Sequence, residues 1–268
     1  MLTLSEPNSE LRIVALQRLA QGGKWRVEAM RSYTRPVLLW FTRGQGRITV
    51  AGNTRGYGSH NAIYLPVGTM HGFQMAGPVF GTAIHFPREL SAELPDEPLH
   101  LRLRNVHMQA SLNALIETME RELAQDLPGR DRALVHHAGL VAVWLERHRD
   151  QVEGPQTQRT PPMSEQLAQA FAALVERDFR TGKTIEAYAA ELGVTPTHLS
   201  RVCRSSAGRP ASRILQDRVH YEARKMLADT ALPIKDIASA LGFRSAAYFT
   251  RAFQAQTGAT PSAFRKSN

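Results

Sequence analysis

The chain has 268 residues, of which 43% are hydrophobic, and a formal net charge of +9. This length allows two compact domains, and this composition excludes an intrinsically disordered chain. No apolar run approaches the roughly 20 residues of a membrane span, and residues 1–12 lack the apolar run of a signal peptide, so we expect a cytoplasmic protein with no membrane partner.

Residues 25–87 alternate short apolar runs with Gly, Asn and Pro, a pattern typical of strands joined by turns. The predicted strands are residues 37–41, 47–50, 62–65, 72–75 and 79–86. Because no helical crossover fits between runs so close together, the pattern favours a sandwich or small barrel over a parallel sheet.

Residues 103–127 and 131–149 place apolar residues at spacings of three and four, and residues 128–130 interrupt the two helices that this period predicts. So short a connection predicts an antiparallel pair. The two apolar stripes are Leu112, Leu115, Ile116 and Met119 on one helix and Leu134, Val135, Ala138, Val141 and Leu145 on the other. One stripe should pack on the strands, and a second, exposed stripe would make a homodimer through residues 103–149.

Residues 153–162 contain Gln, Thr and Pro but no large apolar side chain, which is typical of a linker. We therefore predict a first domain over residues 1–152, a linker over 153–163 and a second domain over 164–268. The second domain should hold seven helices, at residues 164–179, 184–192, 196–206, 210–229, 233–241, 245–256 and from 261.

One block of the second domain occurs twice, from Ile185 to Ile214 and from Ile234 to Phe264. Each copy has a helical apolar period, a glycine (Gly193 or Gly242) where the chain must turn, and a second helical period with Arg on its outer face. This is the pattern of a helix-turn-helix unit, whose second helix enters the major groove. Two copies predict double-stranded DNA as the partner.

The charge agrees with a polyanionic partner. Residues 164–268 carry 15 Lys and Arg against 9 Asp and Glu. Basic residues that neutralise phosphates release counterions, which favours binding, although a basic surface can also serve solubility alone.

Residues 184–264 resemble the two-headed DNA-binding domain of the AraC-type transcription regulators. The runs that carry the resemblance are PIKDIA at 233–238, LGF at 241–243, AYFTRAF at 247–253, TGATP at 257–261 and FR at 264–265. The resemblance implies seven helices, with the long helix at 210–229 holding two reading heads apart.

The resemblance also implies which side chains contact DNA. The candidate DNA-binding residues are Thr197, Ser200, Arg201, Arg204, Arg244, Ser245, Ala246, Ala247, Thr250 and Arg251. Arg can fork to guanine, whereas the two alanines, where many relatives place longer polar side chains, could contact a thymine methyl or leave the second head to read shape. Arg201 and Arg251 have a structural alternative, which is an ion pair with a neighbouring acid.

Cys203 is the only cysteine, so the chain has neither an intramolecular disulfide nor a cysteine-based zinc cluster. It stands where the second copy has Phe253, and a buried thiol behaves as a small hydrophobe. The runs RVCR at 201–204, GRPA at 208–211 and EAR at 222–224 are similar to the branch of the family that senses aromatic acids.

Residues 44–46, Val50, Gly52 and the run IYLPVGTMHGF at 63–73 resemble the cupin-like β-barrel that the same regulators often carry. The implied fold class is α+β, with an N-terminal cupin-like β-barrel, an antiparallel helix pair and an all-α domain with two helix-turn-helix units. The expected His-x-His and Glu ligands are missing from residues 33–41, so we predict no metal, no cofactor and no catalytic residues.

Strand alternation suggests a ligand pocket inside the barrel, lined by Trp25, Arg35, Trp40, Tyr64, His71 and His85. An Arg there could pair with the carboxylate of an organic acid. In the alternative interpretation the aromatic residues only fill the core, His71 is a hydrogen-bonded interior residue and Arg35 lies in solvent.

The leading hypothesis is a non-enzymatic, sequence-specific transcription regulator that responds to a small organic effector, with RNA polymerase as a further candidate partner. One alternative is a cupin-like enzyme or small-molecule binding protein with a helical accessory domain. Another is a ligand-independent activator whose barrel only dimerises. The sequence leaves open the effector, the operator and the choice between activation and repression.

Overall fold

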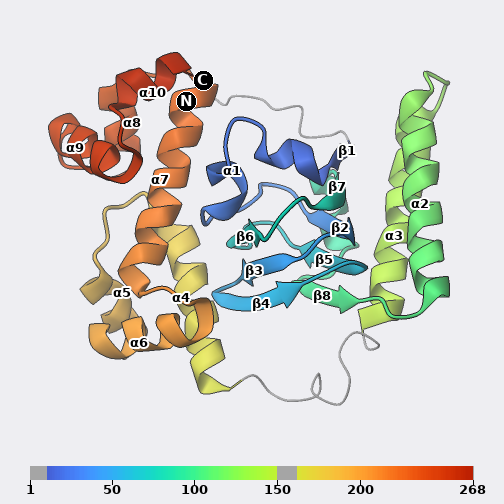
Figure 1. Ribbon diagram of the computed structural model, residues 1–268, viewed down its shortest axis with the longest axis horizontal. Helices are drawn as coiled ribbons and strands as arrows, with labels where there is room; N and C mark the ends of the chain where they lie inside the picture. The colour runs from blue at the N-terminus through green and yellow to red at the C-terminus, as the bar shows by residue number, and fades with distance from the viewer. Residues whose placement is uncertain (1–10, 150–161, 268) are drawn as a thin grey trace.

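The computed structural model describes residues 11–149 and 162–267. Its first part contains eight strands and a helix pair, and its second part contains helices only. Figure 1 shows the strands between the helix pair α2/α3 on one side and helices α4 and α7 on the other. The strands are β1 Arg12–Ala15, β2 Val37–Arg43, β3 Gly46–Val50, β4 Asn53–Tyr57, β5 Asn61–Leu65, β6 His71–Met75, β7 Phe80–His85 and β8 Leu99–Arg102.

The helices of the first part are two 3-10 helices, a one-turn helix and the long pair. They are η1 Leu16–Ala20, α1 Trp25–Glu28, η2 Arg88–Ala92, α2 Val106–Ala124 and α3 Arg130–His148. The second part has the seven helices that the sequence predicts, with ends that differ by at most one residue. They are α4 Met163–Asp178, α5 Ile185–Glu191, α6 Pro196–Ala207, α7 Ala211–Asp229, α8 Ile234–Ala240, α9 Ala246–Thr257 and α10 Pro261–Ser267.

The strands form two antiparallel sheets, one of five strands in the order β1-β7-β2-β5-β8 and one of three in the order β4-β3-β6. The α+β fold class is confirmed, but the expected barrel is two separate sheets within the described residues. Their facing side chains make the core of the first part. Leu39 and Phe41 come from the larger sheet, and Ile48 and Phe73 from the smaller one.

The five predicted strands correspond to β2, β3, β5, β6 and β7, and three further strands were not predicted. β4 has the sequence NTRGY, whose residues are partly or fully exposed except for Tyr57. β1 and β8 have only four residues each and pair at the two edges of the larger sheet. Strands this short, at edges, lack the alternation of apolar residues by which a half-buried strand is found.

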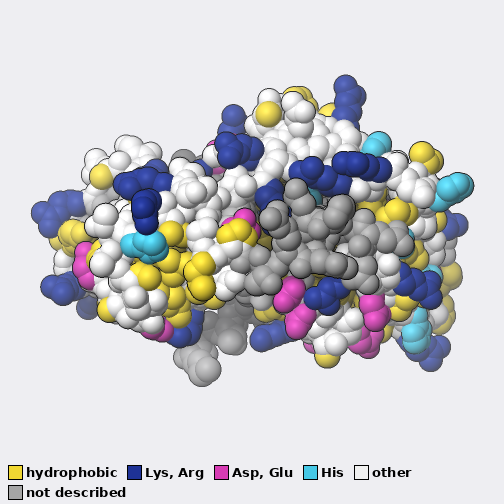
Figure 2. Space-filling model, turned by 90° about the horizontal axis from the view of Figure 1, so that it is seen from below, with side chains coloured by type: hydrophobic (Ala, Val, Ile, Leu, Met, Phe, Trp, Pro, Cys, Tyr) yellow, Lys and Arg dark blue, Asp and Glu magenta, His cyan; other side chains and the backbone are white. Residues whose placement is uncertain are grey.

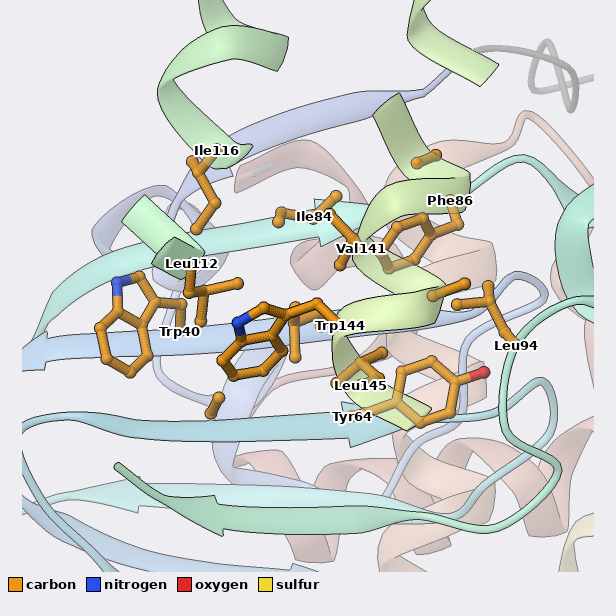
Figure 3. Close-up of a cluster of buried hydrophobic side chains, with 14 of the residues drawn as sticks. Trp40, Tyr64, Ile84, Phe86, Leu94, Leu112, Ile116, Val141, Trp144 and Leu145 are labelled. Atoms are coloured by element: carbon orange, nitrogen blue, oxygen red, sulfur yellow. The ribbon is translucent and has the colours of Figure 1, made fainter. Parts of the chain in front are cut away.

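The antiparallel pair α2/α3 covers the outer face of the larger sheet with both apolar stripes, so the expectation of a second, exposed stripe for the dimer is wrong. Figure 3 shows Leu112, Ile116, Val141 and Leu145 pointing from these helices toward the strands. Val135, which the sequence placed on the apolar stripe of the second helix, is 41% exposed and does not belong to the buried stripe.

The two parts of the chain contact each other over several elements. Met30 and Met70 join the core of the helical part. The Trp25 ring lies 5.7 Å from the ring of Tyr221 on α7 and 6.1 Å from that of Phe264 on α10. The linker prediction falls mostly on residues 150–161, outside the described residues, so a two-domain division with boundaries at 153 and 163 stays a prediction.

A buried ion-pair network anchors this contact. The Arg218 guanidinium on α7 donates to both carboxylate oxygens of Glu176 on α4, at 2.7 and 2.9 Å, and to Glu222 at 2.9 Å. Arg180 donates to the other Glu222 oxygen at 2.6 Å, and the Ser32 hydroxyl of the first part donates to Glu176 at 2.5 Å. Each charged group of this network therefore has a partner of opposite charge, and a charge can be buried without a large cost only when it is paired in this way.

We predict that the protein loses stability as the pH falls from 6.5 to 4.5. Burial lowers the pKa of His85, His100 and His220 to about 4. Between these values and about 6.5 the unfolded chain binds protons that the folded chain does not, so lowering the pH favours unfolding, by roughly 2 kcal/mol per histidine. Urea denaturation at pH 7.0 and 4.5 measures the difference.

The control is His220→Gln, because His220 packs against Phe253 within the helical part and its Nδ1 has no hydrogen-bond partner. The variant should lose about a quarter of the pH effect, because burial also lowers the pKa of a fourth histidine, His71. A free energy of unfolding that stays constant from pH 7.0 to 4.5 would contradict the assignment.

Candidate nucleic-acid interface

Local capping interactions define both helix-turn-helix units. In the first, the Thr184 hydroxyl accepts a hydrogen bond from Ala187 N–H at 3.4 Å and begins α5, and Thr195 accepts from His198 N–H at 3.2 Å and begins α6. In the second, Ser245 accepts from Tyr248 N–H at 3.2 Å and begins α9. These side chains satisfy backbone donors at helix N-termini and fix where each second helix starts.

The turns between the paired helices need glycine. Gly193 and Gly242 have φ of +68° and +75°, a conformation that side chains other than glycine rarely adopt. After each second helix, Gly208 and Gly258 repeat the feature with φ of +70° and +77°. The repeat seen in the sequence is therefore also a repeat of backbone conformation.

Helix α6 turns one face to the core and leaves the other in solvent. Leu199, Val202 and Cys203 are buried. Burial raises the pKa of the Cys203 thiol to about 12, as expected for a packing residue and not for a reactive thiolate. Of the candidate DNA-binding residues on the outer face, Thr197, Arg201 and Arg204 are exposed and Ser200 is half-buried.

Helix α9 repeats this division. Phe249 and Phe253 are fully buried. The candidate DNA-binding residues on its outer side divide into an exposed group and a half-buried group. The exposed group is Arg244, Ser245, Ala247 and Arg251, and the half-buried group is Ala246 and Thr250. Ala246 also packs against the core of the helical part, so its methyl group has a structural role.

The candidate DNA-binding arginines Arg201 and Arg251 differ in charge compensation from five other arginines of the helical part. Arg177, Arg180, Arg209, Arg213 and Arg218 all form ion pairs. Within the described residues, neither Arg201 nor Arg251 has a carboxylate within 4 Å; the Arg201 guanidinium lies 3.0 Å from the ring Nδ1 of His198. The structural alternative, an ion pair with a neighbouring acid, is therefore not what the described residues contain, and both cations remain available to an anionic partner.

Helix α7 connects the two units. It has 19 residues, which gives a length of roughly 28 Å at 1.5 Å per residue. Figure 1 shows α5 and α6 toward one end of α7 and α8 and α9 toward the other. Figure 2 views the end with α5 and α6, and Lys and Arg side chains stand out over that part of the surface.

Two further side chains, one exposed and one half-buried, lie beside these candidates on the same two helices. Tyr248 on α9 is 57% exposed. His198 on α6 occupies the matching position, the third residue after the capping Thr195, as Tyr248 is the third after Ser245. His198 and Tyr248 are 50 positions apart, which is the offset of the repeat, so the sequence repeat could have identified both as candidate DNA-binding residues.

The six residues suggested as a ligand pocket do not come together. Trp40 and Tyr64 point away from the space between the sheets into the core under α2 and α3, where the Trp40 Nε1 donates to Asn113 at 2.8 Å (Figure 3). Trp25 lies at the contact with α7 and α10. The prediction assumed that these aromatic residues face the interior of a barrel. They instead lie on the outer face of the larger sheet, which α2 and α3 cover.

The other three, Arg35, His71 and His85, remain near one another. His71 and His85 both lie beside the Tyr33 ring, with ring centroids 4.6 and 5.3 Å from it. Arg35 is 4% exposed, so the alternative that placed it in solvent is wrong, and its charge lowers the pKa of His85 after the larger effect of burial. Among the described residues, no three His, Cys, Asp or Glu side chains converge as metal ligands.

The comparisons with known proteins agree with this geometry. A helix-turn-helix domain family matches residues 188–267. The transcriptional activator RhaR of Klebsiella pneumoniae is 28% identical over 210 residues, covering 77% of this chain and 68% of that protein. The arabinose operon regulatory protein of Escherichia coli is 29% identical over 105 residues, covering 39% of this chain and 36% of that protein.

Two solved structures resemble this chain, both with low TM-scores. ToxT from Vibrio cholerae has a TM-score of 0.44 and 12% identity, covering 96% of this chain and 97% of that one. The C-terminal domain of AraT from Geobacillus stearothermophilus has a TM-score of 0.36 and 28% identity, covering 41% of this chain and 89% of that one.

The paired units, the matching helix-turn-helix family and the similarity to RhaR define the class first: the protein is a DNA-binding transcription regulator and not an enzyme. Its C-terminal domain is of the AraC type, and the chain is a homologue of the AraC-type regulators. No helix of the described residues is both long and apolar enough to cross a bilayer.

Proposed function

We propose that the protein binds duplex DNA with α6 and α9 in successive major grooves and that the part with the two sheets senses a small organic effector. The observation that carries the DNA contact is the pair of exposed arginines, Arg201 and Arg251, at matching places on the two second helices and without an acidic partner among the described residues. Arg in this position can donate two hydrogen bonds to guanine.

The length of α7 supports the grooves being consecutive. At roughly 28 Å it is close to the roughly 34 Å of one helical turn of B-form DNA. The two helices would then meet the same face of the duplex. Thr197, Ser200 and Arg204 are the proposed neighbours of Arg201 on the DNA, and Arg244, Ser245, Ala247 and Thr250 those of Arg251, while Ala246 contributes through packing.

Arg201→Ala and Arg251→Ala should each cost roughly 1 to 3 kcal/mol of discrimination at specific base pairs. The measurement is fluorescence anisotropy with a duplex selected from a random pool and with single base-pair changes in it. Arg177→Ala, which removes an exposed arginine that is paired with Asp178 and Glu191, is the matched control and should change binding little. A loss that is equal on every sequence would reassign both residues to phosphate contacts.

We propose that the protein dimerises through the helix pair. Leu140 on α3 is 52% exposed and Val143 is 38% exposed, one turn apart on the face turned away from the sheet. Exposed apolar side chains so placed favour a partner surface, and a dimer would double the number of reading heads on one DNA. The ligand-independent activator stays open as an alternative, because it needs the same surface.

Leu140→Glu should convert a dimer into a monomer, because a charge would then be buried between copies. Sedimentation velocity of the wild type and the variant over a range of concentrations measures this. Ala114→Glu, which adds the same charge at an exposed position of α2, is the control. A wild-type protein that is monomeric at all concentrations would refute the dimer. Any contact with RNA polymerase would then be made by a monomer bound to DNA.

A further inference from the structure

A cluster of basic and aromatic side chains lies at one end of the core between the two sheets. Arg31 and His71 pair in an isolated antiparallel bridge, in which Arg31 N–H donates to the His71 carbonyl at 2.9 Å and His71 N–H to the Arg31 carbonyl at 2.7 Å. Residues directly opposite each other in such a pair project to the same side. The guanidinium and the imidazole are therefore neighbours, and the Tyr33 ring covers both.

The cluster contains a buried guanidinium, that of Arg31. Arg31 is 1% exposed and its guanidinium donates to the Val27 carbonyl at 2.5 Å and to the Tyr33 hydroxyl at 3.2 Å. Within the described residues no carboxylate lies within 4 Å of it. The charges of Arg31 and Arg218 act on His71, but Arg218 is itself paired with Glu176 and Glu222. The buried Arg31 guanidinium, which has no carboxylate partner among the described residues, favours an anion.

The cluster also contains an acceptor without a donor. His71 Nδ1 lies 2.9 Å from the Thr69 carbonyl oxygen, which can only accept, so Nδ1 carries the hydrogen and Nε2 the lone pair. Burial lowers the pKa of His71 well below 6.5, so the ring is neutral at pH 7. Nε2 is buried and has no hydrogen-bond partner in the described part of the chain. Buried polar atoms normally have a partner, and this one requires a donor.

We propose that Arg31, Tyr33 and His71 bind a small hydroxy acid, whose carboxylate accepts hydrogen bonds from the Arg31 guanidinium and the Tyr33 hydroxyl and whose own hydroxyl donates to His71 Nε2. The Tyr33 oxygen accepts from Arg31, which leaves its hydrogen for the ligand. Tyr33 is only partly buried and belongs to the irregular segment before β2, so rotation of its side chain opens the site. The proposal rests on the effector-responsive regulator proposed above and names the class of its effector.

The site adjoins the contact with the DNA-binding part. Ser32, between Arg31 and Tyr33, donates to Glu176 on α4, and the charge of Arg218 on α7 acts on His71. A ligand that moves Tyr33 or adds an anion beside Arg31 therefore changes the surroundings of the Glu176–Arg218 pair. This gives the hydroxy acid a physical route to the two reading helices.

The test is isothermal titration calorimetry of the full chain with lactate, salicylate and 4-hydroxybenzoate, which differ in the distance between carboxylate and hydroxyl. Propionate and benzoate lack the hydroxyl, and lactamide and salicylamide lack the charge. At least one hydroxy acid should bind saturably, the acid without the hydroxyl should bind about tenfold more weakly, and the amide roughly 10- to 100-fold more weakly.

Three variants locate the binding. Arg31→Met should weaken binding of the hydroxy acid roughly 10- to 100-fold, and Tyr33→Phe, at a partly exposed position that tolerates change, about tenfold. His71→Phe should abolish the preference for the hydroxy acid over the simple acid. Arg47→Met, an exposed arginine of β3, is the control and should bind as the wild type does.

The proposal is overturned if none of the three hydroxy acids binds saturably, if the hydroxyl and the charge make no difference, or if Tyr33→Phe and Arg47→Met bind alike. DNA binding, measured on the same preparation without any acid, separates this failure from a failure of the proposed regulator. Hydroxy-acid binding that leaves DNA affinity unchanged would support the site and remove its role as effector.

Discussion

Replacing Arg218 with Met should destabilise the protein by roughly 3 to 5 kcal/mol, because the change leaves two buried carboxylates without their main partner. The Arg218 side chain is 5% exposed and the Glu176 and Glu222 side chains are 17% and 11% exposed. Its guanidinium also lies 3.8 Å from the centroid of the Phe179 ring, so the variant loses a cation–π contact as well. Urea denaturation followed by circular dichroism measures the loss.

The matched control is Arg177→Met. Arg177 forms ion pairs with Asp178 and Glu191 at 2.6 and 2.7 Å, but its side chain is 57% exposed, so solvent screens them and the loss should be much smaller than that of Arg218→Met. Combining Arg218→Met with Glu176→Gln and Glu222→Gln should recover much of the stability, because no buried charge is then left unpaired. An Arg218→Met protein within 1 kcal/mol of the wild type would show that the network is not what holds α4 to α7.

Gly242→Ala should cost far more than Gly193→Ala, although the two glycines occupy the same place in the two units. Both have positive φ, so alanine at either position costs about 1 to 2 kcal/mol. A Cβ at Gly193 would meet nothing within 4 Å, whereas one at Gly242 would lie 2.4 Å from the Gly182 nitrogen and 2.6 Å from the Arg180 carbonyl oxygen.

Because those neighbours are backbone atoms, the turn of the second unit would have to move away from the loop after α4. Overpacking of this kind adds roughly 1 to 3 kcal/mol, for a total of roughly 2 to 5 kcal/mol in Gly242→Ala. The free energies of unfolding of the two variants, measured side by side, test this. Equal losses would mean that the close approach of residues 182 and 242 does not persist in solution.

The helical part could be predicted because its signals are local. Apolar spacing, the capping residues Thr184 and Thr195 and the glycines at 193 and 242 act within a few residues, and the repeat presents each of them twice. The exposed and buried faces of α6 and α9 follow from the same spacing. The comparison with relatives then confirms the class of protein that the repeat and its motifs indicated.

The candidate ligand pocket could not be predicted, because it depends on which face of each sheet is covered. Alternation along β2 and β5 tells which residues share a face, but not that α2 and α3 would cover the face that carries Trp40 and Tyr64. Arg31 was missed because it follows a one-turn helix and pairs with His71 through a single bridge, 40 positions away along the chain. Contacts between the two parts, such as Trp25 with Tyr221, have no sequence pattern at all.

The central claim is that α7 holds two reading helices at a fixed separation on one face of DNA. The most direct test measures the affinity of the full chain for a selected duplex and for the same duplex with 5 or 10 base pairs inserted between the segments that Arg201 and Arg251 protect. A fixed separation of about one helical turn predicts that both insertions reduce the affinity to that of a single segment. Affinity that is independent of the insertion would contradict the account.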